Sequence, residues 1–152
     1  MSMDRRHTTA LVERIARVRE VQAKQGLSQA LAREREQRLL AEASATRLQS
    51  TEQGLMTLLA SERLDLSRTG LYQDLASAQQ ITLANDQQTL KEREEARVAR
   101  ADDLARKSHY RDGASLRAIG AVRTYQLTGE RKEAEGLVES WVLRGLRKAS
   151  HE

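Results

Sequence analysis

The sequence predicts an all-α protein, a long two-helix antiparallel coiled-coil hairpin. Proline is absent from all 152 residues, and an interior proline would destabilise a helix by roughly 3 kcal/mol. Alanine, leucine, arginine, glutamate and glutamine dominate the chain, and these residues lose little side-chain freedom in a helix. Aromatic residues make up only 3% of the chain and Phe is missing. A thick globular core is therefore not expected.

The first helix is expected over about residues 4–66, where apolar residues recur at intervals of three and four. This spacing is typical of one face of a helix, and the stripe is as narrow as a coiled-coil seam. Gly26 and Gly54 lie inside it, and each costs about 1 kcal/mol relative to alanine without ending the helix. The stripe consists of Leu11, Ile15, Val18, Leu27, Leu31, Leu48, Leu55, Leu59 and Leu66.

The turn is expected over about residues 67–70. Asp65, Ser67 and Thr69 offer capping oxygens, and Gly70 can adopt the left-handed conformation that ends many helices. A second helix then covers about residues 71–148, with a possible kink or stop at residues 127–130. The whole chain, residues 1–152, would form a single helical hairpin. The competing architecture is one continuous helix paired in parallel with a second copy. We expect the hairpin, as a monomer.

Catalytic and cofactor chemistry are not expected. A two-helix hairpin offers no concave site that excludes water. The chain has no cysteine, and His7, His109 and His151 are scattered without a second ligand at helical spacing. Acidic residues alternate with arginines and lysines, which is typical of a solvated helix surface. We therefore expect no enzyme activity, no cofactor and no metal site.

Membrane insertion is not expected either, because no stretch approaches the roughly 18 apolar residues of a membrane span. The N-terminus lacks the apolar run of a signal peptide, so the cytoplasm is the expected location. The calculated pI of about 9.8 permits contacts with phosphates. Acidic residues interrupt almost every basic cluster and stacking aromatics are lacking, so nucleic-acid binding is not expected.

What remains is recognition of protein partners by helix faces. Large apolar residues gather near the turn and near the C-terminus, and they exceed what a narrow seam can bury. The alternative is that they close the hairpin at its two ends. These residues are Leu55, Met56, Leu58, Leu59, Leu71, Tyr72 and Leu75 near the turn, and Leu137, Trp141, Val142 and Leu146 near the C-terminus.

Two segments resemble the FliJ/YscO family, the coiled-coil stalk proteins of flagellar and virulence type III secretion systems. They are residues 11–20, LVERIARVRE, and residues 69–78, TGLYQDLASA. In that family a similar stripe of aromatic and leucine residues opens the second helix. Here Leu71 stands at the position of the usual aromatic, with Tyr72 beside it. The resemblance spans nearly the whole chain.

The resemblance implies a cytosolic export component with three kinds of protein partner: a hexameric export ATPase, an export gate protein and export chaperones. At the ATPase ring end it implies contacts through Leu11, Ile15, Val18, Val138, Trp141 and Val142. At the export-gate end it implies contacts through Leu55, Leu59, Leu71, Tyr72, Leu75 and Ala78. Within this second group, Leu71, Leu75 and Ala78 match family stripe positions, and Leu55 and Leu59 are inferred from lying opposite them.

Two other functions fit the same composition. A structural adaptor or tether without an export role would form stable homodimers. A nonspecific nucleic-acid binder would show a steep salt dependence.

Overall fold

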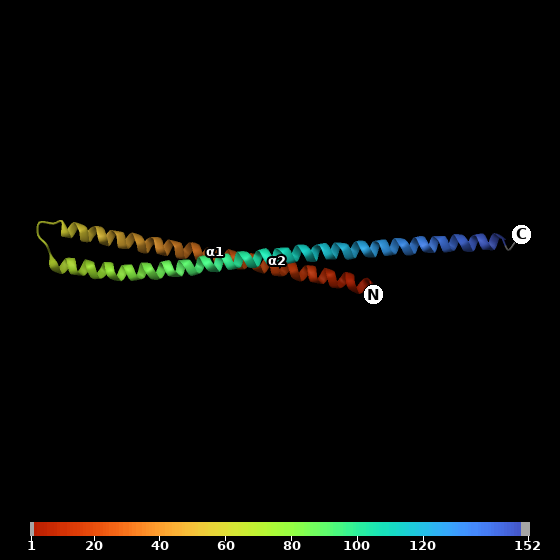
Figure 1. The fold of residues 1–152 in the computed structure, drawn as a ribbon, viewed down its shortest axis with the longest axis horizontal. Helices are drawn as coiled ribbons and strands as arrows, with labels where there is room; N and C mark the ends of the chain where they lie inside the picture. The colour runs from red at the N-terminus through yellow and green to blue at the C-terminus, as the bar shows by residue number, and fades with distance from the viewer. Residues whose placement is uncertain (1, 150–152) are drawn as a thin grey trace. The chain divides into compact units, whose positions relative to one another are not determined.

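The computed structural model confirms an all-α helical hairpin (Figure 1). Helix α1 spans Ser2–Leu59 and helix α2 spans Leu66–Ala149. The two helices pack against each other and run in opposite directions. The structure describes the backbone of residues 2–149 and the side chains of residues 5–144. Within that range it contains no strand.

The turn lies at residues 60–65, earlier than the sequence indicated. Asp65 provides the reason, because its Oδ1 accepts a hydrogen bond from the backbone N of Arg68 at 3.1 Å. This is the geometry of an N-cap, so Asp65 starts α2 instead of ending α1. Ser61 Oγ donates a hydrogen bond to the Leu58 carbonyl at 2.7 Å, which gives this carbonyl in the last turn of α1 a partner. The expectation that Gly70 adopts a left-handed conformation was wrong, since no described glycine has a positive φ.

The chain divides into two compact units, each built from a segment of both helices. Unit 1 consists of residues 1–21 and 106–152, and unit 2 consists of residues 22–105. Unit 2 therefore contains the turn, and unit 1 contains the start of α1 and the end of α2. In unit 1, α2 passes through residues 127–130 without a stop.

The seam between the helices is built from small and polar residues. Among residues 5–144, every buried hydrophobic residue is an alanine, and Ala16 and Ala114 in unit 1 are each only 1% exposed. On α1 the buried positions follow the three-and-four spacing of a coiled coil. They are Ala16, Glu20, Ala23, Glu34, Ala41, Ser44 and Thr51. Small side chains at these positions let two helix backbones approach closely.

The leucine stripe expected on α1 therefore lies only partly in the seam. Leu27, Leu48 and Leu55 are half-buried, whereas Leu11 and Ile15 are exposed. The expected stripe coincides with the seam at Leu27, Leu48 and Leu55, which follow buried residues by four positions, and departs from it at Leu11 and Ile15. The phase of the seam is set by contacts across it, where alanine permits the closest packing.

Polar contacts across the seam fix how α1 and α2 align. In unit 2, Arg97 Nε lies 2.5 Å from Glu34 Oε2, and Ser44 Oγ donates to Asp86 Oδ2 at 2.5 Å. In unit 1, Ser115 Oγ donates to Glu13 Oε1 at 3.2 Å. Each contact pairs a residue of α1 with one partner on α2. A shift of one helix along the other would separate these polar groups at a cost in free energy.

Candidate protein-binding surfaces

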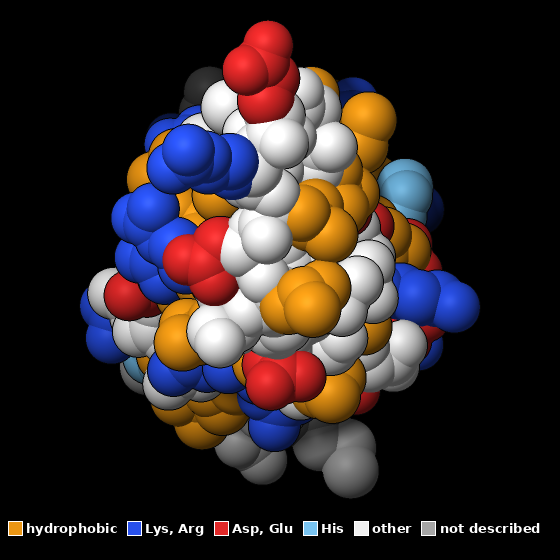
Figure 2. Space-filling model, turned by 90° about the vertical axis from the view of Figure 1, so that its left-hand side faces the viewer, with side chains coloured by type: hydrophobic (Ala, Val, Ile, Leu, Met, Phe, Trp, Pro, Cys, Tyr) orange, Lys and Arg blue, Asp and Glu red, His pale blue; other side chains and the backbone are white. Residues whose placement is uncertain are grey.

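The turn-end surface of unit 2 carries the residues expected to contact an export gate. Leu71 is 68% exposed, and Leu59 and Leu75 are also exposed. Ala78 is exposed too, whereas Leu55 and Tyr72 are half-buried. Figure 2 looks onto the turn and shows hydrophobic side chains at the surface among the charged ones. The exposed leucines of this surface are available to a partner.

Tyr72 is half-buried because its ring lies against α1. The nearest position is Gly54, where an added β-carbon would be 2.6 Å from Tyr72 Cε1. The structure thus brings the first turns of α2 beside the α1 segment that contains Leu55. Sequence reasoning included these two residues but missed Leu64 and Leu66, which are also exposed at the turn. Only the true position of the turn assigns them to this surface.

The second expected group does not come together in unit 1. Leu11, Ile15 and Val18 are exposed on α1. The Arg6 guanidinium lies 4.5 Å from the centre of the Tyr125 ring, which marks where the start of α1 meets α2. Trp141 lies 16 residues farther along α2, about 24 Å at 1.5 Å per residue. The two halves of the expected ATPase-binding end therefore form separate surfaces.

The last part of α2 extends beyond the described part of α1. After Tyr125 the helix continues to Ala149, and the first described residue of α1 is Ser2, only four positions before Arg6. Trp141 is 77% exposed, and Leu137, Val138, Val142 and Leu143 are exposed as well. We call residues 130–149 the α2 extension. Leu146, expected in the same patch, falls outside the described side chains.

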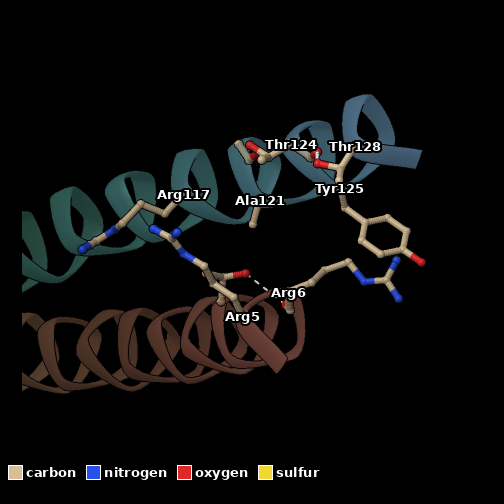
Figure 3. A pocket seen from close by; sticks show the side chains of 9 residues that line it. Arg5, Arg6, Arg117, Ala121, Thr124, Tyr125 and Thr128 are labelled. Atoms are coloured by element: carbon tan, nitrogen blue, oxygen red, sulfur yellow. Dashed lines mark hydrogen bonds between the residues drawn. The ribbon is translucent and has the colours of Figure 1, made fainter. Parts of the chain in front are cut away.

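A pocket in unit 1 combines three arginines with an apolar lining (Figure 3). We call it the arginine pocket, and its volume is about 430 Å³. α1 contributes Arg5 and Arg6, and α2 contributes Arg117, Ala121 and Tyr125. Its described lining residues include no acidic side chain. Sequence reasoning missed this site because Arg117 lies 111 or more residues after Arg5 and Arg6 in the chain, and only the alignment of the helices brings them together.

The described residues contain no group of three or more His, Cys, Asp or Glu side chains placed to hold a metal ion. No helix in that part of the chain combines the length and apolar character of a membrane span.

Comparisons with protein families, curated proteins and solved structures found no match to this chain.

Proposed function

We propose that this protein is a central-stalk component of a flagellar or virulence type III export apparatus, working on its cytosolic side. In this role it binds the hexameric export ATPase ring and the export gate, and escorts export chaperones. The observation that carries the proposal is the exposure of large apolar side chains at two separate places. They are the turn-end surface of unit 2 and the α2 extension of unit 1.

The seam explains why these surfaces are available. A hairpin that buried its leucines would have little apolar surface left for partners. Here the most buried apolar side chains of the seam are alanines, Leu71 and Leu75 lie exposed beside it, and Trp141 lies exposed on the α2 extension. Exposed apolar patches in a soluble environment usually mark interaction sites, and an exposed aromatic anchor such as Trp141 is typical of binding hot spots.

The division of the surfaces suggests how the stalk engages its partners. The α2 extension is a single helix, narrow enough to enter the pore of a ring. The turn-end surface, with Leu71 and Leu75 on α2 and Leu59 at the end of α1, suits a flat partner such as the export gate. The stalk would act mechanically, by coupling asymmetry in the ring to events at the gate, with no chemical step of its own.

The direct test measures phosphate release by a cognate export ATPase as the full-length protein is added. We expect no hydrolysis by the protein alone and a several-fold stimulation of the ATPase. Trp141→Ala should reduce the stimulation, whereas Leu39→Ala should not, although Leu39 is also exposed. Absence of both stimulation and co-sedimentation with the ATPase would rule out the stalk role.

A structural tether is the second candidate, and one observation favours it. Leu39, Leu40 and Ile81 are exposed in unit 2 away from the turn-end surface, and binding at the turn-end surface and the α2 extension leaves them unexplained. A tether would pair with a second copy along this region. Sedimentation equilibrium distinguishes the two, because a stable homodimer that Leu39→Ala dissociates supports the tether.

A further inference from the structure

We propose that the arginine pocket is a docking site for an acidic amphipathic helix of a protein partner. The helix carries two carboxylates about two turns apart, with a large apolar side chain between them on the same face. This site lies apart from the turn-end surface and from the α2 extension. It does not depend on an export role.

The charge around the pocket is strongly positive. Unit 1 contains 15 Lys and Arg against 9 Asp and Glu, a net charge of +6, whereas unit 2 has 11 against 13, a net charge of −2. Residues 113–129, which supply the α2 side of the pocket, include Arg117 and Arg123 and no acidic residue. The net charges therefore favour binding of an acidic partner to unit 1 over unit 2.

The three arginines retain hydrogen-bond donors for a ligand. Among the described residues, none of them forms an ion pair with a carboxylate. Arg6 stacks on the Tyr125 ring, and a stacked guanidinium keeps its edge N–H groups available. Arg117 donates its Nε to the Gly113 carbonyl at 3.1 Å, and its guanidinium lies 6.0 Å from the centre of the Tyr110 ring. Arg5 is exposed.

The rest of the lining offers few donors. Thr9, Thr124 and Thr128 each donate their hydroxyl hydrogen to a backbone carbonyl, at 3.0, 2.8 and 2.7 Å. Between Arg117 and Arg6 the lining includes Gly120 and Ala121, and the Tyr125 ring lies beside Arg6 at one end. A ligand must therefore meet guanidinium groups at the edges and apolar surface in the middle.

The arginines are spread along the groove and do not converge on one point. In Figure 3, Arg117 lies toward one end, Arg6 lies beside Tyr125 at the other, and Arg5 lies between them. Positions 117 and 125 are eight residues apart, or about 12 Å along α2. A single compact anion cannot reach both ends. A helix with carboxylates about seven residues apart spans about 10 Å and places an intervening side chain over Ala121.

The apolar middle also distinguishes a helix from a nucleic-acid backbone. A phosphate chain gains affinity from continuous basic contacts, and here the groove between the arginines is apolar. A third helix laid into the groove between two close-packed helices buries its apolar residue and pairs its carboxylates at the same time. Each Arg–carboxylate contact can be bidentate, which fixes the position of the helix.

The test uses the full-length protein and a fluorescent helical peptide of about 16 residues, long enough to hold a helix. The peptide carries two glutamates seven residues apart and a leucine four residues after the first. Fluorescence anisotropy at about 0.15 M salt, where surface charges are screened beyond about 8 Å, measures its Kd. Arg117→Gln and Arg6→Gln should each weaken binding about tenfold.

Arg123→Gln is the matched control, because it removes the same charge from the same helix outside the pocket. It should change the Kd less than about twofold. The control peptide has glutamine in place of both glutamates and should bind at least tenfold more weakly. Circular dichroism confirms that each protein variant keeps its helix content.

Three results would overturn the proposal. The glutamine peptide could bind as tightly as the glutamate peptide, or Arg123→Gln could weaken binding as much as Arg117→Gln does. Inorganic phosphate at about the salt concentration of the assay could also displace the peptide completely, which would assign the site to a small anion. Displacement only by excess unlabelled glutamate peptide supports the helix.

Discussion

The Tyr72 ring covers Gly54 so closely that a β-carbon at position 54 would stand 2.6 Å from Tyr72 Cε1. Real β-carbons do not approach a ring atom so closely, so Tyr72 can lie against α1 only because position 54 has no side chain. Gly26, also inside α1, has more space, because a β-carbon there would meet Arg100 Cδ at 3.7 Å. Substitution by alanine is therefore expected to change the free energy of unfolding in opposite directions at Gly54 and Gly26.

Gly54→Ala should lower the free energy of unfolding by about 1–2 kcal/mol, because overpacking outweighs the gain in helix propensity. Gly26→Ala should raise it by about 0.5–1 kcal/mol, since only the propensity changes. Urea unfolding followed by circular dichroism measures both. Combining Gly54→Ala with Tyr72→Leu should recover part of the loss. Equal effects of the two alanine variants would contradict the close contact.

The contacts of Glu34 lead to a second prediction, a difference in stability between substitutions at Glu34 and at Glu36. Its side chain is 9% exposed and lies 2.5 Å from Arg97 Nε across the seam and 2.8 Å from Arg38 Nη2 on its own helix. Glu34→Gln should lower the free energy of unfolding by about 1–2 kcal/mol, because both charge-assisted contacts are lost. Glu36 is exposed, and Glu36→Gln should stay within about 0.5 kcal/mol of the parent. Similar melting temperatures for the two variants would argue against the seam contact.

The position of the turn can be tested at Asp65 and Gly70. Asp65→Ala removes the cap on Arg68 N and should destabilise the hairpin by about 1 kcal/mol, whereas Asp65→Asn should preserve most of it. Gly70 lies inside α2 with nothing within 4 Å of an added β-carbon. Gly70→Ala should therefore stabilise the protein. A loss of stability on Gly70→Ala would indicate a left-handed glycine and a turn at residues 67–70.

Trp141 allows a spectroscopic test of the α2 extension, since it is the only tryptophan. Its 77% exposure predicts emission typical of water and ready quenching by iodide. A partner that covers the extension should shift the emission to shorter wavelength and protect it from iodide. Trp141→Ala should leave the melting temperature within about 2 °C, because the side chain contributes little to the fold. Protected emission from the protein alone would mean that the extension is already covered.

The fold class was predictable because helix propensity and periodicity are local properties of the sequence. The phase of the seam was not, because the rows containing Leu11 and Ala16 have the same spacing. The choice between them depends on partners across the seam: Glu20, for example, is tolerated there beside Arg111, whose Nε lies 3.4 Å from Glu20 Oε2. Such pairs join residues that are far apart in the sequence.

The candidate surfaces were also only partly predictable from the sequence. The leucines near the turn could be assigned from composition and spacing, and so could Trp141. The arginine pocket could not, because Arg6 and Arg117 become neighbours only when the alignment of the two helices is known. The expected grouping of Val18 with Val138 failed for a related reason, since it assumed that the two helices end together.

The α2 extension has a consequence for how fast its backbone amides exchange with solvent. Residues 130–149 form about five helical turns. The described part of α1 does not extend alongside these turns, so it does not shield their backbone hydrogen bonds from water. Their amide protons should therefore exchange with solvent sooner than those beside Ala16 or Ala114, where the two helices pack together. A partner that packs along residues 130–149 should then slow this exchange, so hydrogen exchange would map the contact on α2.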